Sequence, residues 1–447
     1  MSVEGPTGWQ NWRAYAADRA WGTTEYPLFT DAWLTSEVPG GLGPYTILNA
    51  IRGNGVPDRY PAAYLRADWH LGPNADHVPA EKWKTETAAY HGGDFADELA
   101  SLISLVLGIR LQAGGETRQF GSHVDDPLGR PISYWFKSVR PLSLPRYEGR
   151  AIMPRQSSHV DLGGLLTSPL ISYATLDQKS ASAVVQTARL YQEALWIAED
   201  RPEWTWVMLV SAVERAAACW QDVEIDPAEW LDELEPTLRG EFEAANCSEL
   251  FSVLASKLAK YIGSTKRFRE FVLEFLPAPP PVRPAHGRYP WSEEALGRAM
   301  TTIYKWRSLY LHKGVPFPAP MCEPPTREEA KGACYEVPIG LGMRVAGGTW
   351  LAKDVPMMLH LFEYIVRHAL LGWWTRLAPS PCDINRATAE ELETIEGIGP
   401  SRAKAIVEYR TRVGGFGHHH ALRQVPGIGE KLASALAGHT ALVPVSK

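Results

Sequence analysis

Apolar residues recur every three to four positions through most of the chain beyond residue 180, which is the period of an amphipathic helix. One such pattern places Leu250, Leu254 and Leu258 on a single face. Helix-start signals accompany the patterns, since Pro202 opens one of them and Ser292 precedes another. The sequence therefore predicts a bundle of five or six helices, over 181–198, 202–219, 247–262, 267–276, 292–311 and 354–374.

The first 170 residues follow a different pattern, in which short apolar runs are broken by Gly and Pro. This pattern favours strands and turns, apart from one helix predicted over 94–109. A Pro-Ser-Pro segment at 379–381 marks a later boundary. We therefore expect a mainly α multidomain protein, with a mixed α/β N-terminal domain over 1–175, a helical bundle over 176–378 and a small all-α domain over 382–447.

The composition is that of a globular protein, with 45% hydrophobic and 21% charged residues and a net charge of −6. This charge excludes a globally basic coat for nucleic acid, so any such binding must lie in a local patch. The five cysteines form no C-x-x-C pair, which indicates reduced thiols. No stretch reaches the ~20 apolar residues of a membrane helix, and the N-terminus has no apolar signal region. We expect a cytoplasmic protein without a membrane partner.

The last 65 or so residues contain an internal repeat, in which GIGPSRAKAI recurs 30 residues later as GIGEKLASAL. Each copy predicts a tight turn between two helices, because glycine permits a positive φ and lets the backbone approach a ligand closely. The N–H groups at the start of the following helix favour an anion. A phosphate fits this chemistry, and Arg402, Lys404 and Lys431 lie within about one helical turn. Thr388 and Glu391 form a capping box upstream.

This segment resembles the tandem helix-hairpin-helix domain of competence DNA receptors and of several repair proteins. The resemblance is carried by Asn385, the capping box, both Gly-Ile-Gly turns and the Gly-Phe pair at 415–416. It implies that the turn amides hold phosphates of the DNA backbone without reading base sequence. Receptors of this type are usually membrane-anchored, whereas this sequence predicts no anchor. The expected DNA-binding residues are Gly397, Ile398, Gly399, Arg402, Lys404, Gly427, Ile428, Gly429 and Lys431, with both isoleucines buried in the core.

An alternative for this domain is a protein-interaction scaffold, because Gly-Ile-Gly also serves as a plain helix–helix turn. The residues after 382 are nearly balanced in charge, with eight Lys or Arg and seven Asp or Glu. Salt-dependent DNA binding would separate the two hypotheses. The run His418–His420 lies between the repeats, but adjacent loop histidines rarely converge on one metal ion. We therefore expect a solvated loop there, with no metal and no cofactor.

The helix predicted over 292–311 ends in the pattern Arg307-x4-His312, followed by Gly314. The spacing alone is weak evidence, since chance places roughly one Arg–His pair at each spacing in this chain, and Arg118-x4-His123 also matches. The context is more specific, because a long helix of the W-x-x-L-V-S-A-V-E type precedes the pattern. The residues that match are Trp206, Leu209, Ser211, Ala212, Val213, Glu214, Arg307, Ser308 and His312.

Together these features resemble the ApeA-type branch of HEPN domains, helical bundles found in metal-independent ribonucleases of defence and toxin systems. His312 suits general acid–base catalysis, and the fork of Arg307 suits phosphate oxygens. Ser308 would orient the phosphate and Glu214 would hold Arg307. Five residues place two side chains about 140° apart on a helix. The pair therefore converges only if the helix loosens near Gly314 or if a homodimer completes the site.

The sequence thus favours a DNA-binding protein with a metal-independent ribonuclease acting on RNA, in a phage-defence setting. The alternative is a non-catalytic DNA-binding adaptor whose bundle only dimerises, with Arg307 on the surface and His312 placed by the helix dipole. In the N-terminal region the H-x-D pairs at 123–125 and 159–161, and the cluster of Asp68, His70, Asp76 and His77, have no metal-site spacing. We expect loop residues there, and a sensing or substrate-presenting domain.

Overall fold

A computed structural model of the chain forms two compact units, which together are about half helical and contain several sheets. The first unit comprises Met1–Ser143, Arg155–Trp196 and Trp374–Lys447, and the second comprises Leu144–Pro154 and Ile197–Trp373. The division into three domains stays a prediction. The structure describes residues 5–15, 20–50, 61–71, 85, 87–121, 126–133, 137–143, 145, 150–154, 159–220, 227–234, 237–328, 332–345, 347–377, 382–395, 397–416, 419–429, 432–433 and 440–441.

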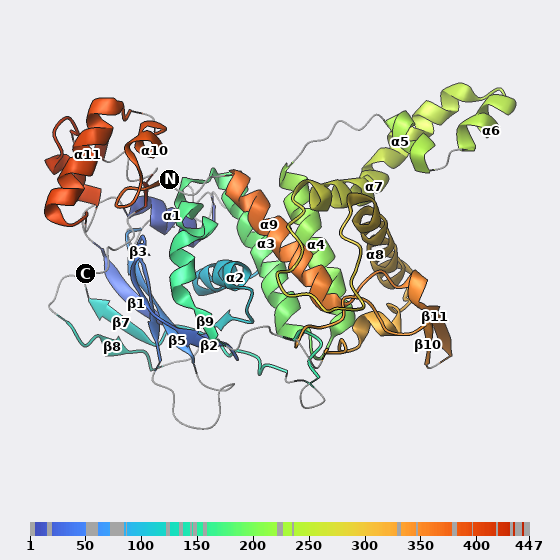
Figure 1. The fold of residues 1–447 in the computed structure, drawn as a ribbon, viewed down its shortest axis with the longest axis horizontal. Coiled ribbons are helices and arrows are strands. Elements are labelled where there is room, and N and C mark those ends of the chain that lie inside the picture. Colours follow the sequence, from blue (N-terminus) through green and yellow to red (C-terminus); the bar gives the residue numbers. More distant parts are fainter. Residues whose placement is uncertain are drawn as a thin grey trace. The chain divides into compact units, whose positions relative to one another are not determined.

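The N-terminal part of the first unit is built on an antiparallel sheet with the strand order β3-β4-β5-β1-β7-β8, in which β6 also pairs with β1 (Figure 1). Residues 63–68 of the strand β5 alternate buried and half-buried positions, as one-sided packing requires, whereas the strand β1 buries Tyr26, Pro27 and Leu28 in succession. The strands are β1 (Gly22–Phe29), β3 (Val38–Leu42), β4 (Tyr45–Asn49), β5 (Ala63–Trp69), β6 (Gln112–Ala113), β7 (Arg118–Gly121) and β8 (Arg130–Pro131). A separate parallel pair joins β2 (Trp33–Thr35) to β9 (His159–Asp161).

Helix α2 (Phe95–Leu107) packs on this sheet, and Phe95 contacts the rings of Tyr26 and Trp69. The helix lies within the predicted range 94–109, with a capping box at Asp94 and a left-handed cap at Gly108. Helices α1 (Thr7–Ala14) and α3 (Gln178–Ile197) belong to the same unit. Glu98 ties α1 to α2, since its buried carboxylate accepts hydrogen bonds from the amides of Gly8 and Trp9, both at 2.9 Å.

The second unit contains the predicted bundle helices α4 (Pro202–Trp220), α7 (Ser248–Glu274), α8 (Glu293–Lys313) and most of α9 (Leu359–Leu377). Ser292 caps α8, as expected, by accepting a hydrogen bond from the Ala295 amide. The prediction of separate helices over 247–262 and 267–276 is wrong, because α7 is continuous. Gly263 lies inside this helix, where a glycine costs about 1 kcal/mol of stability relative to alanine. The packing of Phe268 and Phe271, which are fully buried, outweighs that cost.

Three further elements of this unit were not predicted. Helices α5 (Pro227–Leu234) and α6 (Leu238–Ala244) pack on α7 around Leu231 and Phe251. Strands β10 (Gly342–Val345) and β11 (Gly348–Leu351) form a hairpin. Helix α9 begins at Leu359, not at 354, because residues 355–358 run extended and the Met358 amide donates to the carbonyl of Glu336.

The C-terminal part of the chain, termed the tail (382–447), forms helices α10 (Ala389–Glu393) and α11 (Pro400–Val413) and a short 3₁₀ helix, His419–Gln424. The prediction of an all-α domain is wrong in one detail, since β12 (Cys382–Asp383) and β13 (Thr440–Ala441) pair in parallel. The core of the tail contains Ile384, Leu392, Ile398, Ala403, Ile406, Phe416, Leu422, Val425, Ile428 and Ala433.

Candidate nucleic-acid interface and candidate catalytic residues

The two Gly-Ile-Gly segments of the tail form turns of the same geometry. Gly397 has φ +87° and Gly427 has φ +85°, a left-handed conformation that glycine adopts without a Cβ clash. In each turn the isoleucine amide closes a short loop, since Ile398 donates to Ile395 and Ile428 donates to Val425, at 3.0 and 3.1 Å. Both isoleucines are 4% exposed. The repeat therefore produces two matched turns, each pinned in the core as expected.

Helix α11 starts directly after the first turn, and its N-terminal amides are uncapped. Gly399 is the N-cap residue, in extended conformation, and supplies no side-chain cap. Pro400 has no N–H, and the amides of Gly399 and Ser401 donate no hydrogen bond within the part of the chain that the structure describes. Amides at a helix start carry partial positive charge. This helix start can therefore accept an anion without losing a hydrogen bond to any residue that the structure describes.

The second glycines of both turns have open space in front of them. A Cβ atom added at Gly399 or Gly429 meets no described atom within 4 Å. Neither residue has a positive φ. The first glycines differ, since a Cβ at Gly397 would lie 2.9 Å from Leu432 Cδ1. Gly397 is thus required for the conformation and packing of the turn, whereas Gly399 and Gly429 leave the turn backbone accessible.

The basic residues expected at the turns occupy different environments. Lys404 is 79% exposed and forms a loose pair with Glu408 at 3.9 Å. The guanidinium of Arg402 instead contacts the turns themselves, donating from Nη1 to the Gly397 carbonyl at 2.7 Å and from Nε to the Gly427 carbonyl at 3.0 Å. Lys431 and His418 lie outside the described residues, as do the side chains of His419 and His420.

The other features that suggested a helix-hairpin-helix unit have structural roles. The capping box at Thr388 is present, with hydrogen bonds to and from Glu391. Asn385 holds the linker between the repeats, because its side chain donates to the Phe416 carbonyl and accepts from the Phe416 amide, at 3.0 and 2.7 Å. Arg410 adds a bond to the Ile384 carbonyl, which the sequence analysis missed because no local pattern marks it.

In the bundle, Glu214 on α4 holds Arg307 on α8 at 2.7 Å, so the expected contact is present. Tyr304 donates to the other oxygen of the same carboxylate, also at 2.7 Å, and its ring lies 5.5 Å from the guanidinium carbon of Arg307. Burial and the Glu214 carboxylate raise the pKa of Tyr304 to about 12. Tyr304 was missed by the sequence analysis, although it lies three residues before Arg307 on the same helix.

His312 does not join this cluster within one chain. Helix α8 is continuous through Lys313 and ends at Gly314, whose φ of +65° forms a left-handed cap. The expected loosening of the helix before Gly314 is therefore absent, and five residues separate the two side chains by about 140°. His312 is exposed near the helix end, and Ser308 is half-buried beside Arg307. Only a second copy of the chain could bring a His312 to an Arg307.

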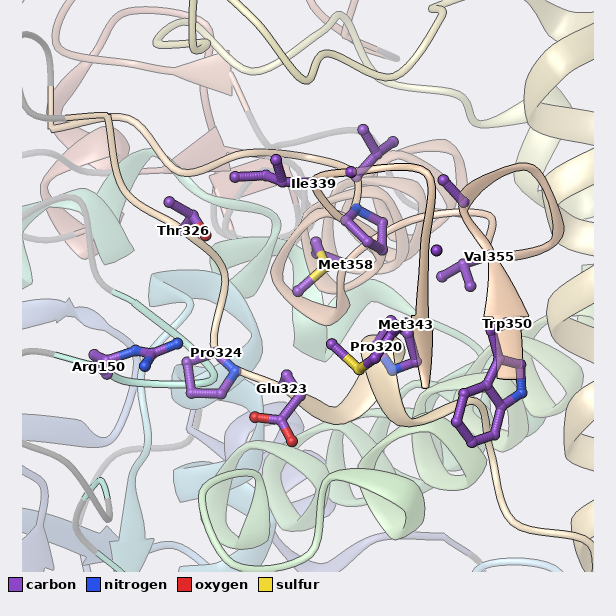
Figure 2. Close-up of a pocket in the computed structure, with 15 residues that line it drawn as sticks. Arg150, Pro320, Glu323, Pro324, Thr326, Ile339, Met343, Trp350, Val355 and Met358 are labelled. Carbon is purple, nitrogen blue, oxygen red and sulfur yellow. The ribbon is translucent and has the colours of Figure 1, made fainter. Parts of the chain in front are cut away.

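The second unit also contains a pocket of about 190 Å³ beside the β10–β11 hairpin (Figure 2). Its lining is largely apolar, and its charged or hydroxyl side chains are those of Arg150, Glu323 and Thr326. The sequence analysis gave no indication of this pocket. Among the described residues that line it there is no histidine or cysteine.

The N-terminal candidates are dispersed. His159 and Asp161 belong to β9, where Asp161 accepts from the Gly163 amide, and Asp68 accepts from the Thr23 hydroxyl at 2.5 Å. His123, Asp125, Asp76 and His77 lie outside the described residues. Within the described ranges, no group of three or more His, Cys, Asp or Glu is placed to hold a metal ion. No helix in those ranges has both the length and the apolar composition to cross a membrane.

Comparison with known proteins assigns a class to the tail. Residues 380–440 match the helix-hairpin-helix motif family. The chain is 51% identical over 49 residues to ComE operon protein 1 of Bacillus subtilis (strain 168), covering 11% of this chain and 24% of that protein. It is 45% identical over 49 residues to an uncharacterized protein of Haemophilus influenzae, covering 11% of this chain and 44% of the relative. The chain thus spans less than half the length of either relative, and no solved structure matches it.

Proposed function

We propose that the tail binds the phosphate backbone of DNA through the amides of its two Gly-Ile-Gly turns, without reading base sequence. The uncapped start of α11 carries this proposal, because the amides of Gly399 and Ser401 have no hydrogen-bond partner among the described residues. A phosphate would satisfy both amides and would interact favourably with the helix dipole. The helix-hairpin-helix match over residues 380–440 supports the same function.

The repetition of the turn strengthens the argument. Gly427 and Ile428 reproduce the conformation and hydrogen bonding of the first turn, so the tail offers two phosphate sites. Two sites acting together would compensate for the weakness of each single contact. Because the salt slope grows with the number of phosphates contacted, few contacts mean weak affinity with a modest dependence on salt. DNA held in this way needs no base-edge hydrogen bonds, so base sequence would have little effect on affinity.

The decisive experiment replaces both accessible glycines with valine in the full chain and measures DNA binding over a salt series. Neither Gly399 nor Gly429 has a positive φ, and both face open space, so Gly399→Val with Gly429→Val leaves the tail folded. The valine side chains occupy the space a phosphate needs, and we expect affinity to fall at least tenfold. Hydrogen exchange of α11 verifies the fold of the variant. Undiminished binding would reject the turn amides as the DNA site.

A matched control uses Gly397, the glycine of the first turn that is required for its conformation. Gly397→Val combines a positive φ with a Cβ 2.9 Å from Leu432, so we expect it to loosen the tail, at a cost of about 3 kcal/mol. A variant that loses both DNA binding and protection from hydrogen exchange has a folding defect. A variant that loses DNA binding but keeps its protection has lost a contact with DNA. If wild-type protein binds no DNA at low salt, the protein-interaction scaffold becomes the better hypothesis.

We propose, as a second candidate function, metal-independent cleavage of RNA by the bundle as a homodimer, in a phage-defence setting. The observation that favours it is the contact of Glu214 with Arg307, which holds the guanidinium in a fixed position. Because His312 diverges from Arg307 on the continuous α8, this function requires His312 from a second copy. The proton transfers would fall to His312, as general acid–base, and phosphate binding to Arg307, with Ser308 beside it.

Incubation of RNA with wild-type protein and with His312→Ala in EDTA tests this second function. We expect cleavage by wild type alone, with 2′,3′-cyclic phosphate ends, and a dimer by light scattering. Arg298→Gln is the control, because Arg298 lies on α8 in an exposed pair with Glu294. Cleavage that survives in His312→Ala rejects the assignment. A monomeric protein that cleaves no RNA favours the adaptor, in which only the tail contacts nucleic acid.

A further inference from the structure

Arg402 connects the two Gly-Ile-Gly turns, which are 30 residues apart in the sequence. Its guanidinium donates to the carbonyls of both left-handed glycines, at 2.7 Å to Gly397 and at 3.0 Å to Gly427. The first bond stays within one repeat, and the second crosses to the other. A single side chain therefore holds both turns at once.

The two repeats contact each other reciprocally, through the residue at the same position in each repeat. Arg402 is five residues after Gly397, and Leu432 is five residues after Gly427. A Cβ at Gly427 would lie 3.7 Å from Arg402 Cγ, and a Cβ at Gly397 would lie 2.9 Å from Leu432 Cδ1. Each turn is thus covered by the equivalent side chain of the opposite repeat. Leucine contributes only packing, so the polar part of this connection depends on Arg402.

The chemistry of the two carbonyls explains why an arginine occupies this position. Both carbonyls belong to the left-handed glycines of the turns, a few residues beyond the ends of α10 and of the 3₁₀ helix, and a backbone carbonyl can only accept hydrogen bonds. A guanidinium offers several donors in a rigid plane, so it can serve two acceptors at a fixed separation. A lysine ammonium is a single point on a flexible stem and holds such a separation less well.

We propose that Arg402 is a positioning residue, which fixes the distance between the two turns so that their amides engage DNA phosphates together. This inference rests on the proposed DNA-binding function, and it assigns Arg402 a different role from that of a phosphate ligand. The free energy of two-site binding depends on the preset distance between the sites, because rigid sites lose less conformational entropy on binding. Loosening the connection between the turns would weaken DNA binding without removing a phosphate contact.

The test uses three variants of the full chain. Arg402→Leu copies the residue that occupies the equivalent position in the second repeat, and Arg402→Lys keeps the charge but not the fork. Arg412→Gln is the control, since it removes one charge from the same helix and Arg412 lies over the ring of Tyr409, with no contact to a described residue of either glycine turn. Hydrogen exchange of the free protein is measured at the amides of Ile398 and Ile428. DNA affinity is then measured between 50 and 300 mM salt, concentrations over which phosphate contacts change affinity strongly.

If Arg402 positions the turns, exchange at Ile428 rises by about tenfold in Arg402→Leu, although the substitution lies in the other repeat. Affinity for DNA falls by a similar factor while the slope of log affinity against log salt is unchanged. Arg402→Lys shows the same changes to a smaller extent, and Arg412→Gln leaves exchange unchanged. If Arg402→Leu unfolds α11 as a whole, Arg402→Lys decides the question.

Unchanged exchange at Ile428 in both Arg402 variants would overturn the proposal. Unchanged exchange with a salt slope reduced by about 0.9 would instead identify Arg402 as a phosphate ligand. The exchange measurement needs no DNA, so it tests the positioning role even if wild-type protein fails to bind DNA. Failure of the DNA-binding function and failure of this inference are therefore distinguishable.

Discussion

The tail and the bundle each contain an arginine suited to phosphate, and in both regions that arginine has a protein partner. Arg402 donates to two backbone carbonyls, whereas Arg307 pairs with the Glu214 carboxylate. The consequences differ. In the proposed DNA-binding function the tail has a second set of phosphate donors, the backbone amides after Gly397, whereas the proposed ribonuclease depends on Arg307 itself. A site made of backbone amides leaves its arginine available for positioning, while in the bundle the arginine is the proposed ligand and Glu214 positions it.

The largest effect we expect concerns Trp206, which opens the helix pattern that suggested a ribonuclease. It is fully buried between Phe317 and Phe362, with ring centroids 6.0 and 4.8 Å away, and its indole N–H donates to the Met321 carbonyl. Trp206→Ala should destabilise the bundle by about 4 kcal/mol. Denaturant unfolding, followed by hydrogen exchange of α4 and α9, measures the loss.

Trp206→Phe is the matched variant, because it retains the stacking and removes the indole donor. It leaves the Met321 carbonyl without that bond and should cost about 1 to 2 kcal/mol. Both variants should leave the tail unaffected. An alanine variant as stable as wild type would show that Trp206 is not part of the core.

The elements that were predicted correctly are those whose own sequence carries the signal. Helix α8 has Ser292 as its cap and Gly314 at its end, and the two turns of the tail have glycines where the φ values require them. The β10–β11 hairpin was missed because all four residues of β10 are exposed, so no apolar alternation marks it.

Sequence patterns failed where the deciding partner lies far away in the chain. The contact of Arg402 with the Gly427 carbonyl was not predicted, since nothing local marks an acceptor 25 residues later, and its role as a DNA-binding residue stays a prediction. The break expected in α7 was likewise predicted from local pattern, whereas the burial of Phe268 and Phe271 keeps the helix continuous. The spacing of Arg307 and His312 suggested a shared site, but a continuous helix separates them.

A second prediction concerns His360, one of four histidines in the bundle, and its response to pH. His360 on α9 is half-buried with its Nδ1 atom fully covered, and desolvation lowers its pKa to about 4, although Glu336 acts in the opposite direction. The unfolded value is about 6.5. Because the folded state disfavours the protonated form, stability is fully present above pH 6.5 and is lost as pH falls toward 4, by on the order of 2 kcal/mol.

His360→Gln should reduce this acid-dependent loss. Part of it should remain, because desolvation also lowers the pKa of His368 on the same helix. Exchange rates of the α9 amides, measured between pH 4 and 7 and corrected for intrinsic rates, give the stability profile. A profile in His360→Gln that matches wild type would assign the acid sensitivity to another group.

The smallest effect we expect is also the one that best separates contact from positioning in the tail. Lys404 is 79% exposed, and its only described pairing is the 3.9 Å contact with Glu408. Exposed pairs of this kind contribute little to stability, so Lys404→Gln should leave hydrogen exchange of both turns unchanged. If its ammonium lies near a phosphate, the variant lowers DNA affinity by a few fold and reduces the salt slope by about 0.9.

Arg402→Leu should produce the opposite pair of results, faster exchange with an unchanged slope. Two variants on one helix, each removing one positive charge, thus assign the charge of Lys404 to DNA binding and that of Arg402 to the geometry of the turns. A salt slope unaffected by Lys404→Gln would restrict the interface to the backbone amides.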